Sequence, residues 1–594
     1  MNNLLLKIDL SSEKVGIEEI SDEILEQYLG GRGLGVKLLC DNLKGKIDPL
    51  APGNVMIFAI GPLTSTIVPT SGRFSLVTKS PLTNTLTHSN SGGFWGSVFK
   101  RCGYDALLVT GKLNGDTKGY ILIDGVSVKI KDAGDLWGLN SGETVEKLNE
   151  LEGKCQVLSI GPAGENLVRI SAIMNQAHRA FGRGGVGTVM GSKGLKAIVV
   201  KGGTKKFSPP DLDHLKQLNL VASDKIKVFP ITSQGLPLFG TAVMMKVINA
   251  FGMLPINNNQ KGQDTRIDDV SGERLREDFF QRDEGCYACP IRCGRLTNTG
   301  EMKGKGPEFE SLWALGPQCG IFDLKIITHA NYFCNKYGLD TISTGVTIAC
   351  AMELQQRGLL NDAGMKFGNG KVLLDLIRKI AYKEGIGGEL AEGSLRFAEK
   401  SGGVQYAMQV KGMELPAYDP RGAMGQALNY ATSNRGACHL TGYLIGMELL
   451  GVPKLIDRFT IAGKADQLVL KQNQSAVEDS LVTCKFVGFA LGLDFQVRFL
   501  QAVTGIDFNI TELVKVGERI HTLERMFNLR EGFSKKDDTL PERFLKEPLN
   551  EGASKGQVVP LEKLLSDYYQ VRDWNEDGIP TDALLDELDL VRLT

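Results

Sequence analysis

The sequence has almost no net charge and no long apolar run. Its 68 Lys and Arg residues nearly balance its 69 Asp and Glu residues, for a formal net charge of -1, so it lacks the basic surplus that nucleic-acid binding requires. No stretch reaches the roughly 18 consecutive apolar residues of a membrane helix. The first residues, MNNLLLKIDLSSEKV, hold too short an apolar patch for a secretory signal. We therefore expect a cytoplasmic protein with no nucleic-acid and no membrane partner.

Histidine is scarce, whereas glycine is in excess. Only six histidines are present, which argues against a site built from several of them. The 11 cysteines are an odd number in a chain with no expected export signal, so metal ligation or burial is expected in place of disulfides. Glycine supplies 71 of 594 residues, about 12% against a usual ~7%. These glycines cluster between apolar segments, which predicts tight loops where backbone approaches a bulky ligand.

The hydrophobic pattern changes along the chain. Up to about residue 207 it consists of short β-prone runs bounded by Gly, Pro, Ser or Asn. These runs are Val55–Ile60, Phe74–Lys79, Ala106–Thr110, Gly119–Ile123 and Ala197–Lys201. Beyond Pro209 and Pro210, Asp211 can cap a helix. Apolar residues then recur every three to four positions, in Lys325–Lys336, Val346–Arg357, Lys371–Glu384 and Glu389–Ser401.

A second boundary lies near residue 415, in the segment Leu-Pro-Ala-Tyr-Asp-Pro. Helical periodicity resumes at Gln426 and continues to about Phe527. We predict the α+β class, with a β-rich domain over residues 1–207 and two mainly helical domains over residues 208–414 and 415–594.

The sharpest local motif is Cys286-Tyr-Ala-Cys289-Pro-Ile-Arg-Cys293. A [4Fe–4S] cluster needs four thiolates, and the fourth often comes from far along the chain. A zinc site is the alternative and would need a fourth ligand nearby, for which Cys319 and His329 are the nearest candidates. The spacing favours the cluster.

The remaining cysteines fall into two groups. Cys484 follows a carboxylate by five residues, in Asp479-Ser-Leu-Val-Thr-Cys484, and the residues alone leave open whether it is a ligand or a core thiol. The others that lie in apolar periodic segments are expected in the core. They are Cys40, Cys102, Cys155, Cys334 and Cys350.

Glycine loops that carry Arg or Asn recur in the first domain. Gly182-Arg-Gly-Gly-Val-Gly187 has the form of a dinucleotide loop. However, a polar segment precedes it and no acid lies about 20 residues on, so a nicotinamide site is rejected. Related loops occupy residues 30–35, 69–74 and 87–93. Turn chemistry would explain any one of them, but together they predict a large, multiply charged ligand.

Taken together, these segments resemble the aldehyde:ferredoxin oxidoreductase family in order and spacing along nearly the whole chain. Each piece is weak alone, and the combination is specific. The matching segments are Gly31–Gly35, Pro62–Gly72, Ser89–Gly93, Arg179–Gly185, Cys286–Cys293, Gly306–Glu310, Asn335–Thr344, Glu414–Gly422 and Tyr568–Pro580.

The resemblance implies a tungsten or molybdenum ion held by two molybdopterins, with no protein side chain on the metal. The pterins would lie on the first domain beneath the two helical ones. A Mg²⁺ ion between their phosphates would be bridged through the carbonyls of Asn90 and Ala180, and Arg73 would lie between pterin and cluster. Phosphate binding would fall to Arg179 and to loop glycines, namely Gly92, Gly93, Gly182, Gly184 and Gly185.

The family's pterin-binding pattern, Asp-x-x-Gly-Leu-(Cys/Asp), has two altered counterparts here. The first runs from Asn335 to Asp340, with Asn for the leading Asp, and the second runs from Asp479 to Cys484 without Gly-Leu. These departures put some ring contacts in doubt. The resemblance also implies that Cys484 is the fourth cluster ligand. The family's intersubunit E-x-x-H motif is absent around His329, so no intersubunit metal is expected.

The implied reaction is oxidation of an aldehyde to a carboxylic acid with oxygen from water. Electrons would pass through the cluster to ferredoxin or a small iron–sulfur subunit, and a homodimer is left open. By resemblance, Glu310 is the base and His439 the proton donor or carbonyl polariser. The structural alternative for Glu310 is a carboxylate at the start of a helix that interacts with the helix dipole. The alternative for His439 is a buried histidine whose hydrogen bonds are all made within the protein.

Two other functions remain as hypotheses. One is the catalytic subunit of a tungsten-dependent benzoyl-CoA-type reductase, in which a cysteine ligates the metal. The other is a pterin-free iron–sulfur electron carrier, which would leave the phosphate-type loops without a purpose. The joint presence of Glu310 and His439 favours aldehyde oxidation.

Overall fold

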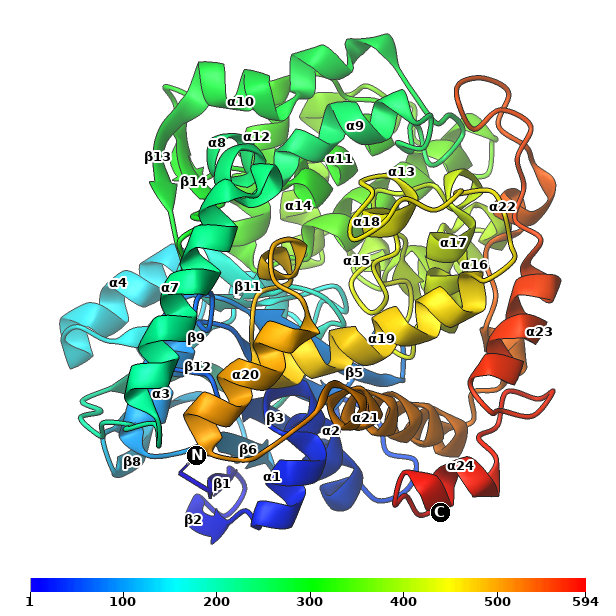
Figure 1. The fold of residues 1–594 in the computed structure, drawn as a ribbon. Helices are drawn as coiled ribbons and strands as arrows, with labels where there is room; N and C mark the ends of the chain where they lie inside the picture. The colour runs from blue at the N-terminus through cyan, green and yellow to red at the C-terminus, as the bar shows by residue number, and fades with distance from the viewer. Residues whose placement is uncertain (1, 594) are drawn as a thin grey trace.

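The first third of the chain forms the β layer. Across residues 2–593, which the computed structural model describes, the strands form two six-stranded sheets and two smaller ones (Figure 1). The first sheet has the order β2-β1-β6-β3-β4-β5. Its strands are β1 (Leu4–Asp9), β2 (Lys14–Glu19), β3 (Met56–Ala59), β4 (Phe74–Lys79), β5 (Leu86–Ser91) and β6 (Ala106–Thr110).

The second sheet has the order β11-β10-β9-β12-β7-β8. Its strands are β7 (Gly119–Asp124), β8 (Ser127–Asp132), β9 (Gln156–Ser159), β10 (Ile173–Asn175), β11 (Arg179–Phe181) and β12 (Leu195–Lys201). The helices of this layer are α1 (Asp22–Tyr28), α2 (Gly31–Asn42), α3 (Trp95–Cys102), α4 (Ser141–Glu152), α5 (Pro162–Glu165) and α6 (Val186–Ser192).

Side-chain alternation divides the strands of the first sheet between two cores. In β3, Met56 and Phe58 belong to an apolar cluster shared with the second sheet, whereas Ile57 and Ala59 belong to the large core on the opposite face. The shared cluster is aromatic: the Phe74 ring stacks on Trp95 with centroids 4.9 Å apart. The sheet is therefore covered on both faces, which explains why β3 and β4 are buried throughout.

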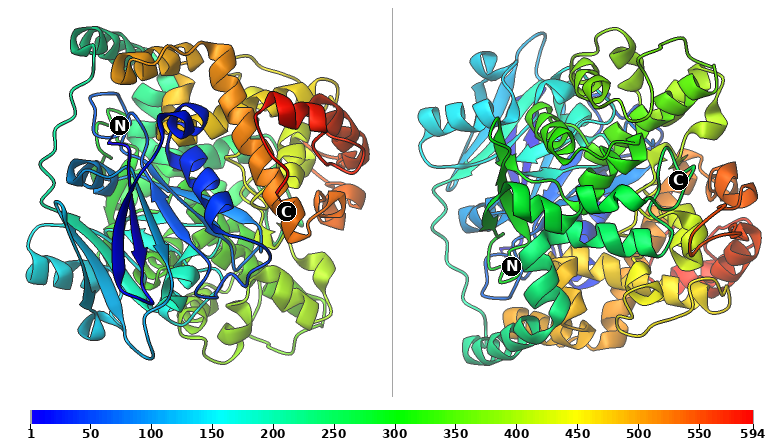
Figure 2. Two further views of the ribbon diagram at one scale, coloured as in Figure 1. Left: turned by 90° about the horizontal axis from the view of Figure 1, so that it is seen from below. Right: turned by 90° about the horizontal axis from the view of Figure 1, so that it is seen from above.

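Helices cover the β layer, as the view from above in Figure 2 shows for the green segments. In the middle of the chain they are α7 (Leu212–Val228), α8 (Leu236–Phe239), α9 (Met244–Ala250), α10 (Gly272–Phe279), α11 (Phe309–Ala314), α12 (Leu324–Tyr337), α13 (Thr341–Gln356), α14 (Gly370–Tyr382), α15 (Ile386–Leu390) and α16 (Ser394–Lys400). The last part has α17 (Met424–Thr432), α18 (Ile445–Glu448), α19 (Lys464–Leu481), α20 (Leu493–Thr504), α21 (Ile510–Glu531), α22 (Glu542–Lys546), α23 (Leu561–Val571) and α24 (Asp582–Glu587).

The α+β class is confirmed, and some expected elements are corrected. Glu389–Ser401 is two helices, because Gly393 adopts a φ of +88° between them. The periodicity from Gln426 to Phe527 is interrupted by long loops between α17 and α19. The cysteine motif forms the loop between β13 (Phe280–Glu284) and β14 (Gly294–Asn298), which make a small sheet with β15 (Lys303–Lys305). Asp211 caps α7 as expected, while domain boundaries at 207 and 414 remain predictions.

One glycine-rich segment begins a helix and packs against another. Residues 30–35 open helix α2, and a Cβ on Gly31 would lie 2.3 Å from the carbonyl oxygen of Asp479. The amide of Gly33 donates to the hydroxyl of Ser480 at 2.9 Å. The glycines therefore allow α2 to pack closely against the end of α19, while a role of this segment in anion binding stays a prediction.

No single helix among residues 2–593 has the length and hydropathy of a membrane span. The segments Leu212–Val228 and Ile231–Ala250 have that length and hydropathy only when they are taken together, and the angle between them is 82°.

A buried ion pair joins the β layer to the helical cover. Arg32 of α2 is 1% exposed and donates two hydrogen bonds to Glu524 of α21, at 2.8 and 2.7 Å. Lys79 of β4 similarly contacts Glu531 at 2.6 Å. Such pairs fix one orientation of the two layers, because an unpaired charge in this interface would be costly.

We predict that Glu524→Gln destabilises the protein by about 3 kcal/mol, because Arg32 loses its main counter-charge inside the interface. The measurement is the apparent Tm by calorimetry. The control is Glu542→Gln. The ion pair of Glu542 with Lys546 is exposed to solvent at both residues, so its loss should hardly change the Tm. Equal Tm values for the two variants would contradict the prediction.

Candidate active site

Glu310 and His439 lie side by side beneath the helical cover. Glu310 stands in the first turn of α11, and His439 lies in the loop that follows α17. Oε1 of Glu310 is 3.5 Å from Nε2 of His439, and the amide of Ala417 donates to Oε2 of Glu310 at 2.9 Å. Oε1 of Glu310 and Nδ1 of His439 are buried and accept or donate no hydrogen bond within residues 2–593. The pair therefore presents unpaired polar atoms, as a ligand site does.

Burial determines the charge of both groups. It raises the pKa of Glu310 to about 8, although the Ala417 amide and Arg183 oppose this. It lowers the pKa of His439 well below the ordinary 6.5, and nearby Arg183 and Arg435 lower it further. At neutral pH the carboxyl is therefore largely protonated and the imidazole is neutral.

Aromatic side chains surround the pair, and the sequence analysis did not find them. The ring centroids of Tyr418 and Tyr443 lie 5.8 and 6.3 Å from that of His439. The two tyrosine hydroxyls are 3.1 Å apart, and Phe309 packs on Tyr418 at 5.5 Å. Tyr418 lies inside the segment Glu414–Gly422, which resembles the family, and this resemblance could have pointed to it. Tyr443 follows His439 by four residues in a loop, where periodicity gives no guidance.

The four predicted cluster cysteines share one neighbourhood. Cys286, Cys289, Cys293 and Cys484 are partly exposed, whereas the other cysteines within residues 2–593 are buried. Thr70 connects the two segments: its amide donates to the Ala288 carbonyl at 2.8 Å, and its hydroxyl accepts from the Cys484 amide at 3.3 Å.

The gathering of thiols is looser than a single ion requires. In the described chain no three Cys, His, Asp or Glu side chains are grouped so as to hold one metal ion. A cube of iron and sulfur is larger and takes its thiolates at separate corners.

Two arginines point at these thiols. Arg73 lies between the Asn90 carbonyl, at 3.2 Å from Nη2, and the Cys484 sulfur, at 4.0 Å from Nη1. Nε of Arg179 donates to the Cys286 sulfur at 3.3 Å, although we had expected this guanidinium on phosphate. Burial opposes ionisation of the Cys286 thiol, but Arg179 and Arg73 bring its pKa below the ordinary 9.0.

In the remaining loops, neighbouring side chains lie so close to several glycines that a larger residue would collide with them. A Cβ on Gly92 would lie 2.6 Å from the Cys286 sulfur, and one on Gly184 would lie 2.5 Å from the Thr87 hydroxyl. Gly93, Gly184 and Gly185 adopt positive φ values. Open space surrounds the Cα of Gly182. A short edge strand, β11, does precede this loop and α6 follows it, but no parallel βαβ unit is formed.

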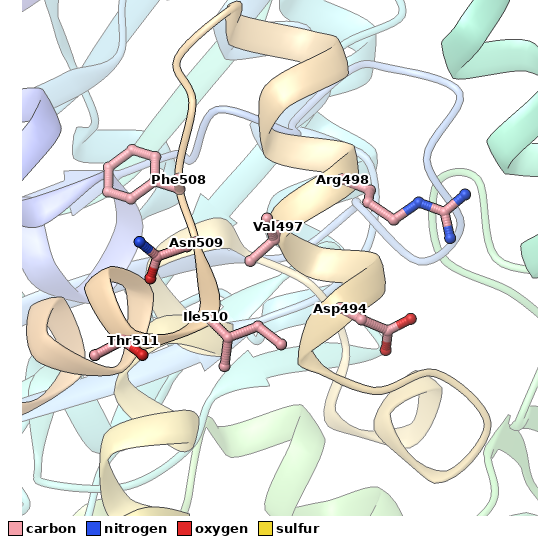
Figure 3. Close-up of a pocket in the computed structure, with 7 residues that line it drawn as sticks. All are labelled: Asp494, Val497, Arg498, Phe508, Asn509, Ile510 and Thr511. Carbon is pink, nitrogen blue, oxygen red and sulfur yellow. The ribbon is translucent and has the colours of Figure 1, made fainter.

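A cavity of about 130 Å³ brings two predicted pterin segments together. Arg179, Ala180 and Gly182 line one side, and Asn335 and Asp340 line the other. A larger surface hollow of about 560 Å³ is drawn in Figure 3. No predicted site residue lines it; its lining is Asp494, Val497, Arg498, Phe508, Asn509, Ile510 and Thr511.

The second pterin segment meets Asn90, which lies in strand β5 and not in a loop as expected from the sequence. Nδ2 of Asn90 donates to Oδ1 of Asp479 at 2.7 Å. Asp479 also lies 3.3 Å from Nζ of Lys485 and 3.6 Å from Nη1 of Arg32. The structure thus brings together Asn90 and Asp479, which are 389 residues apart.

Unpaired polar atoms around these loops suit a ligand rich in hydrogen-bonding groups. Buried atoms without a hydrogen-bond partner in the described residues include Oγ1 of Thr87, Nε2 of His88, Nε of Arg435 and Oγ1 of Thr483. Leaving such an atom unpaired costs about 1–3 kcal/mol. The residues present therefore fit a polar, anionic cofactor.

Two family models match the chain. The model of the aldehyde ferredoxin oxidoreductase N-terminal domain covers residues 5–202, and that of domains 2 and 3 covers residues 217–590. The chain belongs to the aldehyde ferredoxin oxidoreductase family.

Relatives of this aldehyde ferredoxin oxidoreductase family member support the assignment. It is 46% identical to the tungsten-containing aldehyde ferredoxin oxidoreductase of Pyrococcus horikoshii, over 99% of this chain and 98% of that protein. It is 32% identical to the "Aliphatic sulfonate oxidoreductase, WOR-like subunit" of Pyrococcus furiosus, over 99% of this chain and 96% of that protein. The solved active site complex BamBC of benzoyl coenzyme A reductase with 1,5-dienoyl-CoA matches with a TM-score of 0.87 and 26% identity, covering 99% of this chain and 97% of that chain.

The family predicted from the sequence is confirmed, and its alternatives are disfavoured. Identity to the aldehyde ferredoxin oxidoreductases is about 46%, against 26% to the benzoyl coenzyme A reductase structure.

We predict that Glu310 remains protonated at neutral pH, since burial raises its pKa to about 8. The infrared difference between wild type and Glu310→Gln should contain a protonated-carboxyl band below pH 8. Because the raised pKa favours the neutral form, the band should vanish as the pH rises through about 8. A band already lost near pH 5, the range of an ordinary glutamate, would refute the prediction.

Proposed function

We propose that this chain is a tungsten bis-pterin oxidoreductase that oxidises aldehydes to carboxylic acids and delivers the electrons to ferredoxin. The observation that carries the proposal is the Glu310–His439 pair, held 3.5 Å apart with unpaired atoms beneath the helical cover. Family membership supports it, because the curated relatives are tungsten-containing aldehyde ferredoxin oxidoreductases.

The cofactor would lie between the β layer and the helices. When bound, it supplies a Lewis acid that accepts two electrons. Asn335, Asp340 and Asp479 would bind the pterin rings. Glycine amides would hold the phosphates, and the carbonyls of Asn90 and Ala180 would face a bridging Mg²⁺. Support comes from the shared cavity, from the Asn90–Asp479 contact and from β5 lying against β11.

Glu310 is suited to take a proton from water. A carboxyl with a pKa of about 8 is a stronger base than an ordinary glutamate and is partly ionised near neutral pH. The neutral imidazole of His439 can donate a hydrogen bond to the aldehyde oxygen without bringing a net charge into the pocket. Tyr418, Tyr443 and Phe309 exclude bulk water around the pair.

Cys286, Cys289, Cys293 and Cys484 would hold a [4Fe–4S] cluster that passes electrons one at a time. Arg73 supports this arrangement because it contacts both Asn90 of β5 and Cys484. The electron acceptor would be ferredoxin or a small iron–sulfur subunit.

Glu310→Gln should keep the cofactor and lose activity. In anaerobically purified protein with wild-type tungsten and pterin content, we expect kcat/KM for aldehyde-dependent viologen reduction to fall at least about 30-fold, or ~2 kcal/mol. The wild-type rate should rise with pH up to about 8, as Glu310 loses its proton.

The control for this experiment is Glu389→Gln, an exposed glutamate paired with Lys400, which should behave as wild type. Full activity in a loaded Glu310→Gln protein would remove the proposed base. Reduction of benzoyl-CoA without any aldehyde oxidation would replace the proposed reaction.

Cys484→Ser should lower the iron content of the purified protein, because the cluster would lose one of four thiolates. The matched control is Cys155→Ser, a buried cysteine outside the site. Iron is measured by elemental analysis of the two variants and the wild type. Equal iron in all three proteins would show that Cys484 is not a ligand.

A further inference from the structure

Apolar side chains are exposed beside the cysteine loop. Phe94 is 46% and Ile67 44% exposed, Pro290 is exposed, and Tyr287 is partly exposed. We call these four residues the apolar rim. They come from three segments: the turn before β4, the residue that precedes α3, and the loop of the cluster motif. Exposed apolar groups gathered at one place are typical of an interaction site.

Hydrogen bonds connect the three segments of the apolar rim. The amide of Tyr287 donates to the Gly93 carbonyl at 3.1 Å, and the rings of Phe94 and Tyr287 meet edge to face at 6.4 Å. On the other side, the hydroxyls of Ser97 and Ser65 are 3.0 Å apart. The rim is thus a preformed surface, which lowers the entropy cost of binding a partner.

The apolar rim lies beside the thiols that are proposed to hold the cluster. Cys286 and Cys289 flank Tyr287 in sequence and are themselves partly exposed, so a partner on the rim lies directly over the thiols. Arg292 is exposed between Cys289 and Cys293. Its positive charge favours a partner that carries negative charge, as a thiolate-ligated iron–sulfur cluster does.

We propose that the apolar rim and Arg292 form the docking surface for ferredoxin. This inference rests on the proposed function, which requires a protein to collect electrons at the cluster. A small apolar centre with a charge at its edge suits a transient electron-transfer contact, which buries less area than a stable complex.

The test is the double variant Ile67→Ala/Phe94→Ala, with a purified [4Fe–4S] ferredoxin as the probe. We expect KM for ferredoxin to rise about tenfold and calorimetric binding of ferredoxin to weaken equally. Aldehyde-dependent viologen reduction should stay at the wild-type rate, because a small dye needs no docking surface. The matched control is Val126→Ala/Leu151→Ala, which removes two exposed apolar side chains elsewhere.

Unchanged ferredoxin kinetics and binding in the double variant would overturn the inference. So would a change from dimer to monomer on size-exclusion chromatography with ferredoxin binding intact, which would make the rim a contact between two copies of this chain. Failure of the proposed function is distinguishable, since it appears as absence of aldehyde-dependent viologen reduction in the wild type. The calorimetric measurement needs no turnover and tests the rim by itself.

Discussion

The buried guanidinium of Arg32 is the constraint on which the two layers depend. It pairs with Glu524 of α21 and lies 3.6 Å from Asp479 at the end of α19. A charge at 1% exposure is tolerated only with such partners, so α2, α19 and α21 must meet at one place. Asp479 is thereby held against Asn90. Cys484, five residues further on, is then brought to Thr70 and the cysteine loop.

Burial also determines the protonation states of the two groups in the proposed active site. Glu310 and His439 are largely removed from solvent without a counter-charge in direct contact, so burial dominates both pKa values and moves them toward the neutral forms. Asp340 differs in its neighbours, because Nε of Arg183 lies 3.1 Å from its Oδ2 and forms a direct ion pair with it. Acid, base and structural carboxylates are therefore distinguished by their neighbours and not by residue type.

Local patterns predicted the strands of the first domain well, because strand formation depends on residues close in sequence. Strand β4 was expected and found at Phe74–Lys79. Long-range geometry was not predictable from the pattern: the glycines at 30–35 resemble an anion loop, yet they serve packing against α19. Tyr443 was missed because only folding brings its loop to Tyr418. The division at residues 207 and 414 and the roles of the individual site residues stay predictions.

Four of the cations around the two proposed centres are arginines, and this limits where pH can act. Arg73 and Arg179 face the thiols, while Arg183 and Arg435 lie near His439. A guanidinium keeps its proton at any working pH, so the field of these four groups is constant. A histidine with a strongly lowered pKa is likewise neutral across that range. Burial places the pKa of Glu310 at about 8, so the pH dependence of the reaction should follow this carboxyl.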